Sequence, residues 1–432
     1  MNVAFYTLGC KVNQYETEAM REAFEAAGHT AVPDSADFDA VVINSCTVTA
    51  ESDRKTRQAL RRFRKEHPSA AVVLTGCMSQ AFPEKAEALA EADVITGNTD
   101  IKKTVAYTEK FIADGVRTVD ISSHPQKERF NTPAIKGFAE RTRAYMKIED
   151  GCERYCTYCI IPTARGYVRS KPLDEIRSEA EALCAAGFTE IVLTGINLTA
   201  YGKETGADLC DAVDAVSAVS GIKRVRLGSL EPDHMSDGML SRLAENQKFC
   251  PQFHLSLQSG CDSTLKRMNR HYDTAFYSDL VQRIRKMFPF AAITTDVMVG
   301  FPGETKEEFA ESLGFVKKTG FAKVHIFAYS RRTGTIAAAL PNQVSRAQKA
   351  ERSHAMSEAA LECEAEFLRS MTGKTFPVLF ESCEDGVNEG YTPNYSRVKV
   401  SCGSRLTGRI LDVKIISAEK ECCIGVLTEI PE

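Results

Sequence analysis

The amino-acid sequence predicts an α/β protein in three parts: an N-terminal doubly wound parallel sheet, a central partial (β/α)6 barrel and a small C-terminal antiparallel β-barrel. Three observations carry this prediction. Short β-branched runs alternate with amphipathic helical patterns over about residues 1–130, as in parallel βαβ units. A second alternating series covers residues 144–330. After residue 372 the pattern changes to period-two alternation with glycine-containing turns, which is typical of antiparallel strands.

The composition is that of an ordinary globular protein. The chain has 432 residues, enough for roughly two to four domains, with 43% hydrophobic and 26% charged residues. The net charge of −4 excludes a globally basic nucleic-acid binder, so any such contact must come from local patches. The first ten residues lack a basic region, and no apolar run reaches membrane-spanning length. We therefore expect a cytoplasmic protein with no membrane partner. Among its 15 cysteines, those that cluster point to metal binding or catalysis rather than disulfides.

The N-terminal part is expected to form one domain over residues 1–125. Its strands are predicted over residues 3–8, 40–44, 71–75 and 93–97, and its helices over residues 15–27, 52–66 and 80–91. A polar segment with two prolines, residues 122–137, is predicted to be a linker.

A cysteine lies just past the end of three of these strands. The three are Cys10, Cys46 and Cys77, each preceded by a glycine or a serine. Because the carboxyl ends of parallel strands share one edge of a sheet, where ligands usually bind, we expect the three thiols to converge. The alternative is three unrelated buried thiols, since free cysteine is among the most buried residue types.

The central part is expected over residues 138–368 and the C-terminal domain over residues 371–432. Six strands are predicted over residues 144–148, 190–195, 224–229, 253–258, 293–300 and 324–330. Six units fall short of the eight in a full barrel, so an open barrel with its chemistry at the carboxyl strand ends is predicted. One long polar helix is predicted over residues 342–372. Small β-barrels such as the one predicted after it often bind oligonucleotides.

The strongest motif directly follows the first barrel strand. Cys152, Cys156 and Cys159 form a CxxxCxxC pattern. Thiolates are the ligands of iron–sulfur clusters, and a four-iron cluster normally takes four, so three cysteines leave one iron open for a small molecule. The alternative is zinc with a fourth ligand elsewhere, although neither a second CxxC nor a His pair lies nearby.

This motif, with the aromatic Tyr158 before its last cysteine, resembles the signature of the radical S-adenosylmethionine (SAM) superfamily. The six-unit partial barrel fits the core of that superfamily. The resemblance implies a [4Fe–4S] cluster whose open iron is chelated by SAM, which is cleaved to a radical when the cluster supplies an electron. The cofactor then supplies the radical chemistry and the protein supplies position.

Polar and glycine residues at other barrel strand ends fit the same interpretation. TGIN ends the second strand, SLEP the third, SLQSG the fourth and TTDVMVGFPGE the fifth. The alternative is ordinary polar core residues and turn glycines, but their shared place at carboxyl strand ends favours SAM contacts. With Tyr158, the expected SAM-binding residues are Gly195, Asn197, Ser229, Glu231, Gln258, Asp296 and Gly300.

The whole chain resembles the methylthiotransferase family. TLGCKVNQYETE, INSCTVT and LTGCMSQ look like the motifs of its N-terminal domain. The resemblance implies a second [4Fe–4S] cluster on Cys10, Cys46 and Cys77, and an RNA-binding TRAM domain in the C-terminal segment. GCKVNQYE, DGCERYCTYCIIP, ARGYVRS and GYTPNYSRV look most like the branch that modifies N6-threonylcarbamoyladenosine in tRNA. Thr163, where the family often has Tyr, departs from the pattern outside the ligand set.

Two basic groups are candidate RNA contacts. Four arginines share one face of the helix predicted over residues 52–66: Arg54, Arg57, Arg61 and Arg64. The alternative is a solvated charged helix. Arg397 and Lys399, flanked by Tyr391 and Tyr395, form a smaller group in the C-terminal barrel, where the tyrosines either stack on bases or pack in the core.

The resemblance implies an enzyme that places a methylthio group on C2 of threonylcarbamoyladenosine beside the tRNA anticodon, in the anticodon stem-loop. It would use two [4Fe–4S] clusters, two SAM equivalents and an electron donor such as flavodoxin or ferredoxin, and DNA would not be a partner. Isopentenyladenosine in tRNA and a ribosomal-protein aspartate are the alternative substrates. A non-catalytic iron–sulfur electron carrier or RNA-binding scaffold is the alternative of another class, but an electron carrier gains nothing from an open iron.

Overall fold

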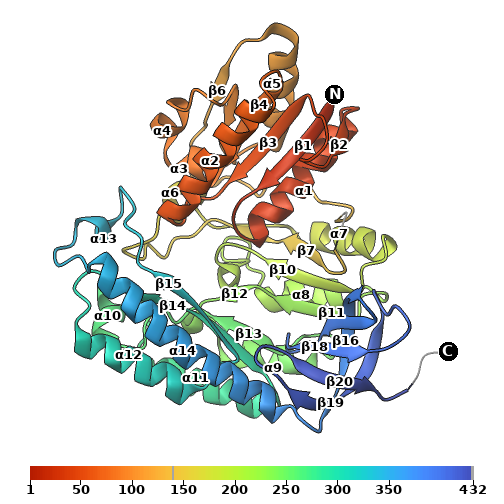
Figure 1. Ribbon diagram of the computed structural model, residues 1–432, viewed down its shortest axis with the longest axis vertical. Coiled ribbons are helices and arrows are strands. Elements are labelled where there is room, and N and C mark those ends of the chain that lie inside the picture. Colours follow the sequence, from red (N-terminus) through yellow and green to blue (C-terminus); the bar gives the residue numbers. More distant parts are fainter. Residues whose placement is uncertain (139–140, 430–432) are drawn as a thin grey trace.

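The computed structural model describes residues 1–138 and 141–429. Figure 1 shows an N-terminal α/β unit, a central set of strands surrounded by helices, and a small β-barrel near the C-terminus. The helices of the described residues include none with the length and apolar character needed to cross a membrane.

The N-terminal unit is a six-stranded sheet in the order β2-β1-β3-β4-β5-β6, and every pair of neighbouring strands is parallel. The strands are β1 (Asn2–Thr7), β2 (Thr30–Val32), β3 (Ala40–Ser45), β4 (Ala71–Gly76), β5 (Val94–Thr96) and β6 (Thr118–Asp120). The helices are α1 (Lys11–Ala26), α2 (Ala50–Glu66), α3 (Cys77–Ala81), α4 (Pro83–Glu87) and α5 (Ile101–Asp114).

Both faces of this sheet are covered, which confirms the predicted doubly wound fold. Alternate residues of β3 and β4 pack with Leu60 and Phe63 of α2 on one face. The residues between them pack with Phe24 of α1 and Val105 of α5 on the other face. Strands buried on both faces read as continuous apolar runs, as AVVIN and AVVLT do here.

The single helix predicted over residues 80–91 is instead two short helices that meet at Phe82 and Pro83. Proline lacks the amide N–H that an interior helical position must donate, so it begins a new helix here. Residues 122–137 contain no helix or strand, as predicted for a linker. This segment is held along α1, where the Tyr15 hydroxyl donates to the carbonyl of Pro133 at 3.0 Å.

The central unit has six parallel β/α repeats in chain order. Its strands are β7 (Ala144–Lys147), β10 (Glu190–Thr194), β11 (Arg224–Leu227), β12 (Ser229–Leu230), β13 (Gln252–Leu255), β14 (Ala292–Val299) and β15 (Lys323–Ala328). The third repeat is interrupted at Gly228, so β11-β10-β7 and β12-β13-β14-β15 form two sheets that follow each other around the barrel. Among the described residues β7 and β15 do not pair with each other, which makes the barrel open, as predicted.

Helices surround these strands, and a short hairpin of β8 (Glu149–Asp150) and β9 (Arg169–Ser170) follows β7. The helices are α6 (Ile161–Arg165), α7 (Leu173–Ala185), α8 (Leu209–Ser217), α9 (Asp237–Glu245), α10 (Asp262–Arg267), α11 (Thr274–Met287), α12 (Lys306–Thr319), α13 (Ile336–Ala339) and α14 (Arg346–Ser370), with short 3-10 turns at Leu198–Ala200 and Pro232–His234. The predicted long helix is α14, which begins at a capping box of Ser345 and Gln348.

The C-terminal unit is a closed five-stranded barrel. Its strands are β16 (Thr375–Glu384), β17 (Val387–Tyr391), β18 (Arg397–Ser401), β19 (Ile410–Ala418) and β20 (Cys423–Leu427), in the order β16-β17-β18-β20-β19. Four of the pairings are antiparallel, and the pairing of β18 with β20 that completes the ring is parallel. The predicted small barrel is thus confirmed, with one parallel pair that its turn pattern does not reveal.

Candidate active site

Three neighbouring strands of the N-terminal sheet place cysteines at one edge. Cys10 follows β1 at the start of α1, Cys46 follows β3, and Cys77 begins α3 directly after β4. Gly9 has a φ of +125°, and a Cβ atom added to it would lie 2.9 Å from the Cβ of Cys46. Glycine is therefore needed for the end of β1 to lie this close to Cys46.

Burial dominates the electrostatics of these thiols. It raises the pKa of Cys77 to about 12 against the opposing charge of Arg165, and the neighbouring thiols of Cys46 and Cys10 add to the rise. Desolvation by the surrounding protein likewise raises the pKa of Cys10, although this residue is exposed at the cavity wall. The three sulfurs are near enough to act on one another, as ligands of one cluster must be.

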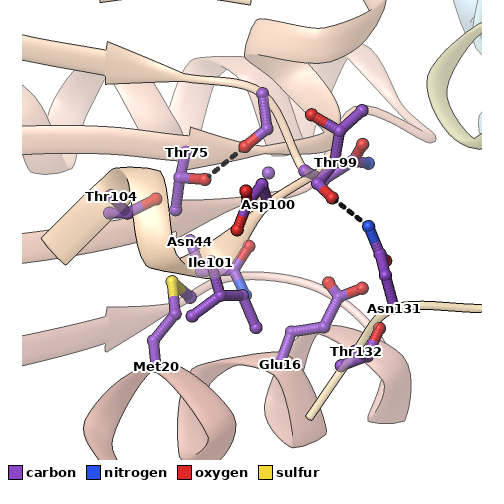
Figure 2. Close-up of a pocket in the computed structure, with 13 residues that line it drawn as sticks. Glu16, Met20, Asn44, Thr75, Thr99, Asp100, Ile101, Thr104, Asn131 and Thr132 are labelled. Atoms are coloured by element: carbon purple, nitrogen blue, oxygen red, sulfur yellow. Dashed lines mark hydrogen bonds between the residues drawn. The ribbon is translucent and has the colours of Figure 1, made fainter. Parts of the chain in front are cut away.

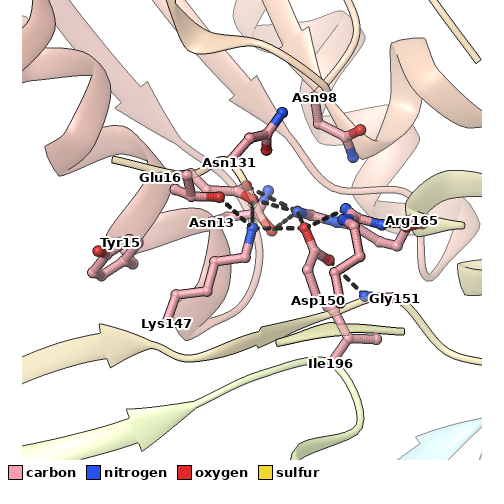
Figure 3. Close-up of polar contacts among 12 residues, drawn as sticks. Asn13, Tyr15, Glu16, Asn98, Asn131, Lys147, Asp150, Gly151, Arg165 and Ile196 are labelled. Atoms are coloured by element: carbon pink, nitrogen blue, oxygen red, sulfur yellow. Dashed lines mark hydrogen bonds and ion pairs between the residues drawn. The ribbon is translucent and has the colours of Figure 1, made fainter. Parts of the chain in front are cut away.

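Arg165 joins this edge to the central barrel through a buried network of charges (Figure 3). Its Nε donates to the sulfur of Cys77 at 3.2 Å, and its Nη2 donates to Glu16 of α1 at 2.9 Å. Lys147 of β7 contacts both Glu16 at 2.7 Å and Asp150 at 2.6 Å. Although burial acts in the opposite direction, Arg165 and Lys147 hold the pKa values of both carboxyls below their usual range. These ion pairs fix the N-terminal sheet against the barrel.

The loop with the CxxxCxxC motif follows β8, and backbone hydrogen bonds to neighbouring segments hold it in place. The amide of Cys152 donates to the carbonyl of Gly166 at 3.0 Å, and the amide of Thr157 donates to that of Met268 at 3.0 Å. Gly151 has a φ of +88°, and an added Cβ would lie 1.9 Å from the carbonyl oxygen of Tyr167. A side chain at position 151 would therefore displace the loop that carries the three cysteines.

A second buried arginine lies against this cysteine group. Arg270 donates to the sulfur of Cys156 at 3.2 Å and forms an ion pair with Glu231, which also faces Arg154 at 3.7 Å. Burial raises the pKa of both Cys152 and Cys159 to about 12. Glu231, expected to contact SAM, is thus placed beside the cysteine loop by two arginines.

The TGIN turn after β10 is built around a carboxyl group that the sequence did not single out. Oε2 of Glu149 accepts the amides of Ile196 at 2.8 Å and Asn197 at 2.7 Å. A Cβ at Gly195 would lie 2.5 Å from the same oxygen. Burial raises the pKa of Glu149 to about 8. Gly195 therefore allows close approach to Glu149, and the acidic pair that follows the first barrel strand was the available signal.

The other predicted SAM residues have the following neighbours. Tyr158 packs edge-on against Phe301, with ring centroids 6.4 Å apart. Gln258 has a φ of +67°, and its backbone N–H donates to the backbone carbonyl of Asp296 at 2.9 Å. A Cβ at Gly300 would lie 2.4 Å from the Lys349 side chain of α14, so this glycine makes room for that lysine.

One cavity of about 700 Å³ brings the three units together. Cys10 and Lys11 of the N-terminal unit line it, as do strand-end residues of the barrel and Tyr391, Tyr395 and Arg397 of the C-terminal unit. Gly195, Ser229 and Asp296 are the expected SAM-binding residues in its wall, whereas Tyr158, Asn197, Glu231, Gln258 and Gly300 are not part of the lining.

A second cavity lies at the carboxyl strand ends of the N-terminal sheet (Figure 2). Its lining includes Glu16, Asn44, Thr75 and Asn131, so the linker segment closes over the edge of the sheet. The space is about 20 Å³, which holds roughly one water molecule. This part of the sheet edge is therefore filled by protein.

The arginines of α2 have different environments. Arg54 pairs with Glu51 at 2.6 Å, and Arg61 pairs with Glu91 at 3.1 Å, both at the surface. Arg64 is half-buried, pairs with Asp93, and donates to the carbonyl of Ala70 at 3.1 Å. Arg64 thus ties α2 to the loops around β4 and β5, while Arg57 is partly exposed.

In the C-terminal barrel, Arg397 and Lys399 both pair with Glu389, at 2.5 Å and 3.1 Å. Tyr391 and Tyr395 stack on each other with centroids 4.7 Å apart and planes at 19°. The guanidinium of Arg143 lies over both rings, at 4.9 Å and 4.6 Å. The tyrosines therefore pack at the contact with the central unit, at the edge of the large cavity.

The donor sets suit iron–sulfur clusters. Across residues 1–138 and 141–429, no three His, Cys, Asp or Glu side chains converge as the ligands of a single metal ion do. The six cysteines form two groups of three, and in each group a buried arginine donates to one sulfur. Thiolates are the ligands of iron–sulfur clusters, and a guanidinium offsets their negative charge.

Comparison with known proteins identifies related families and relatives of similar length. Residues 2–97 match the model of the uncharacterized protein family UPF0004, and residues 146–316 match that of the Radical SAM superfamily. The threonylcarbamoyladenosine tRNA methylthiotransferase MtaB of Bacillus subtilis (strain 168) is 37% identical over 428 residues, or 96% of this chain and 94% of that protein. A tRNA-2-methylthio-N(6)-dimethylallyladenosine synthase of Clostridium perfringens (strain SM101 / Type A) is 31% identical over 434 residues, or 98% of this chain and 97% of that protein.

The fold also has counterparts among solved structures. The radical SAM methyltransferase TsrM from Kitasatospora setae, solved with cobalamin and a [4Fe-4S] cluster bound, matches with a TM-score of 0.58 at 13% identity. The match covers 78% of this chain and 77% of that chain, and it concerns the fold alone. The full-length relatives above 30% identity confirm the resemblance that the motifs predicted: the chain belongs to the radical SAM methylthiotransferase family.

Proposed function

We propose that the chain places a methylthio group on C2 of N6-threonylcarbamoyladenosine, next to the anticodon of tRNA. The observation that carries this proposal is the cavity of about 700 Å³ that reaches from Cys10 past the barrel strand ends to the C-terminal barrel. An enzyme that inserts sulfur into a nucleoside of an RNA needs a sulfur centre, a SAM site and an RNA contact around one space. The cavity wall offers Cys10, the expected SAM-binding residues Gly195, Ser229 and Asp296, and Arg397 of the C-terminal barrel. Relatives at 33–37% identity that are named for this nucleoside support the choice of substrate.

Two [4Fe–4S] clusters are part of the proposal. Cys152, Cys156 and Cys159 would hold one, and Cys10, Cys46 and Cys77 the other. A cluster at the first group, with SAM on its open iron and an electron from a flavodoxin or ferredoxin, would supply radical chemistry. The protein's own part is to offset the charge of the thiolates, through Arg270 and Arg165, and to hold the two groups in a fixed relation through the Glu16 network.

The barrel strand ends are proposed to hold SAM and the C-terminal barrel to hold RNA. Glu149 keeps the Gly195 turn in place, so that the turn presents its backbone to the cavity. The C-terminal barrel is proposed to act as a TRAM-like domain. The basic residues proposed to contact phosphates are Arg397, Lys399, Arg54, Arg57 and Arg61, and the cytoplasm is the proposed location.

Nucleoside mass spectrometry tests the proposal. Transfer RNA from cells that lack the gene should lose the methylthio form of threonylcarbamoyladenosine and regain it when the intact gene is restored. Loss of the methylthio form of isopentenyladenosine instead would assign the other substrate of the family. If neither nucleoside changes, the proposed function is wrong.

A further inference from the structure

The charged residues that line the large cavity are mostly paired. Lys323 pairs with Glu364 at 3.2 Å, Arg397 with Glu389 at 2.5 Å, and Asp296 with His254 at 3.4 Å. Glu421 lies on the exposed turn before β20.

Lys11 differs from these residues. Its Nζ lies 5.9 Å from the centroid of the Tyr145 ring, and among the residues that the structure describes no carboxylate lies within 4.0 Å of it. It follows Cys10 directly, as the first residue of α1, and both residues line the cavity. Its partly exposed side chain is therefore a cation that faces the cavity without a carboxylate partner.

The surroundings of Lys11 add to this excess of positive charge. Three arginines at the contact between the barrel and the C-terminal unit share two carboxylates. Arg143 pairs with Glu381 at 2.6 Å, while Arg226 and Arg224 pair with Glu190 at 2.9 Å and 3.4 Å. With Lys11, the cations in this region outnumber its carboxylates by two. These arginines do not line the cavity, whose wall also holds Asp296 and Glu421, so the excess of positive charge is local to the side where Lys11 lies. Buried charge without a partner is costly, so this side of the cavity is suited to an anionic ligand group.

We propose that Lys11 binds the carboxylate of the threonyl group of the substrate and so selects threonylcarbamoylated adenosine. This inference rests on the proposed function. In that nucleoside C2 and C6 flank the same ring nitrogen, and the substituent on the C6 amino group ends in a carboxylate. A substrate that presents C2 to a cluster at Cys10 therefore carries its carboxylate toward the residue beside Cys10. Adenosine without this group has nothing to pair with Lys11.

Binding of two RNAs by the full chain, with its clusters reconstituted, tests this role. Both RNAs are the same anticodon stem-loop with threonylcarbamoyladenosine, one with the free carboxylate and one with its methyl ester. A hydrogen bond from a charged group contributes enough that the wild-type protein should bind the free acid roughly 10- to 100-fold more tightly. Lys11→Gln should bind both RNAs equally, with the affinity for the ester unchanged, and Lys11→Arg should keep the preference.

Lys110→Gln, at an exposed position of α5, is the matched control and should keep the full preference. Equal binding of acid and ester by the wild-type protein would overturn the inference, and so would a preference that survives in Lys11→Gln. The ester comparison uses unmodified protein, so it decides the question even if a Lys11 variant loses its clusters. If the wild-type protein shows no preference for the acid and does not methylthiolate the acid RNA, both the role of Lys11 and the proposed function are wrong. If it is methylthiolated without a preference for the acid, only the role of Lys11 fails.

Discussion

Replacing Arg165 by Met should destabilise the whole chain, because the guanidinium is fully buried among charges. It faces Glu16 and Asp150, which then keep only Lys147 and Arg169 as partners. Removal of one partner of a buried ion pair costs about 3–5 kcal/mol, and the two remaining cations put the expected loss near the lower end, about 3 kcal/mol. The sequence has no tryptophan, so urea unfolding of the cluster-free chain is followed by far-UV circular dichroism. At a slope of about 3 kcal/mol per M, the midpoint should fall by about 1 M.

A surface arginine is the control for this experiment. Arg177 pairs with Glu181 at 3.2 Å on α7, with 62% of its side chain exposed. Exposed pairs of this kind contribute about 0.5 kcal/mol or less, so Arg177→Met should move the midpoint by less than about 0.2 M. If both variants unfold at the same urea concentration, the account of the Arg165 network is wrong.

Three further predictions concern the two cysteine groups and their supports. Burial raises the pKa of Glu149 from 4.5 to about 8, so its protonated form stabilises the fold below about pH 4.5 and this stability is lost as the pH rises toward 8. Glu149→Gln should remove that loss, as measured by urea unfolding at several pH values, and an unchanged pH dependence would contradict it. Cys46→Ala should abolish methylthio product but keep SAM cleavage, measured as 5′-deoxyadenosine, and loss of both would argue against separate clusters. Gly151→Ala should lower the iron content, because its Cβ would lie 1.9 Å from the backbone of Tyr167. Gly206→Ala, with a φ of +82° but nothing within 4 Å, should retain its iron, and equal iron loss in both would refute the steric argument.

Much of the fold follows from local pattern. β3 and β4 are continuous β-branched runs because they are buried on both faces, and each ends at a polar residue or glycine before its helix. The sequence interpretation missed α5 although Asp100 caps its start and Gly115 ends it in a left-handed conformation, so the signals were present. β2 and β6 were missed for another reason: they are short and partly exposed, so they form no apolar run, whereas β5, equally short but fully buried, does.

The candidate site likewise contains residues that the sequence reveals and residues that only the folded chain reveals. The cysteine positions are visible in the sequence because each follows a strand, and parallel order brings the strand ends together. Glu149, Arg165 and Arg270 were not recognised, because their partners lie tens of residues away and only the folded chain brings them to the turns and thiols they contact. Arg64 shows the converse: its helical spacing suggests an RNA-facing surface, while its partner Asp93 comes from a distant loop.

The unpaired edges of β7 and β15 have a consequence for access. In a closed barrel of eight strands the interior is filled by side chains, and a reactant reaches the site through the loops at one end. Where the ring of strands is not closed, we expect a lateral entrance, and the C-terminal barrel contributes part of the cavity wall. A single base of the proposed RNA substrate would then enter sideways while the ribose and phosphates that carry it stay outside. The missing strands would thus allow a polymer to present one of its residues without being threaded or cut.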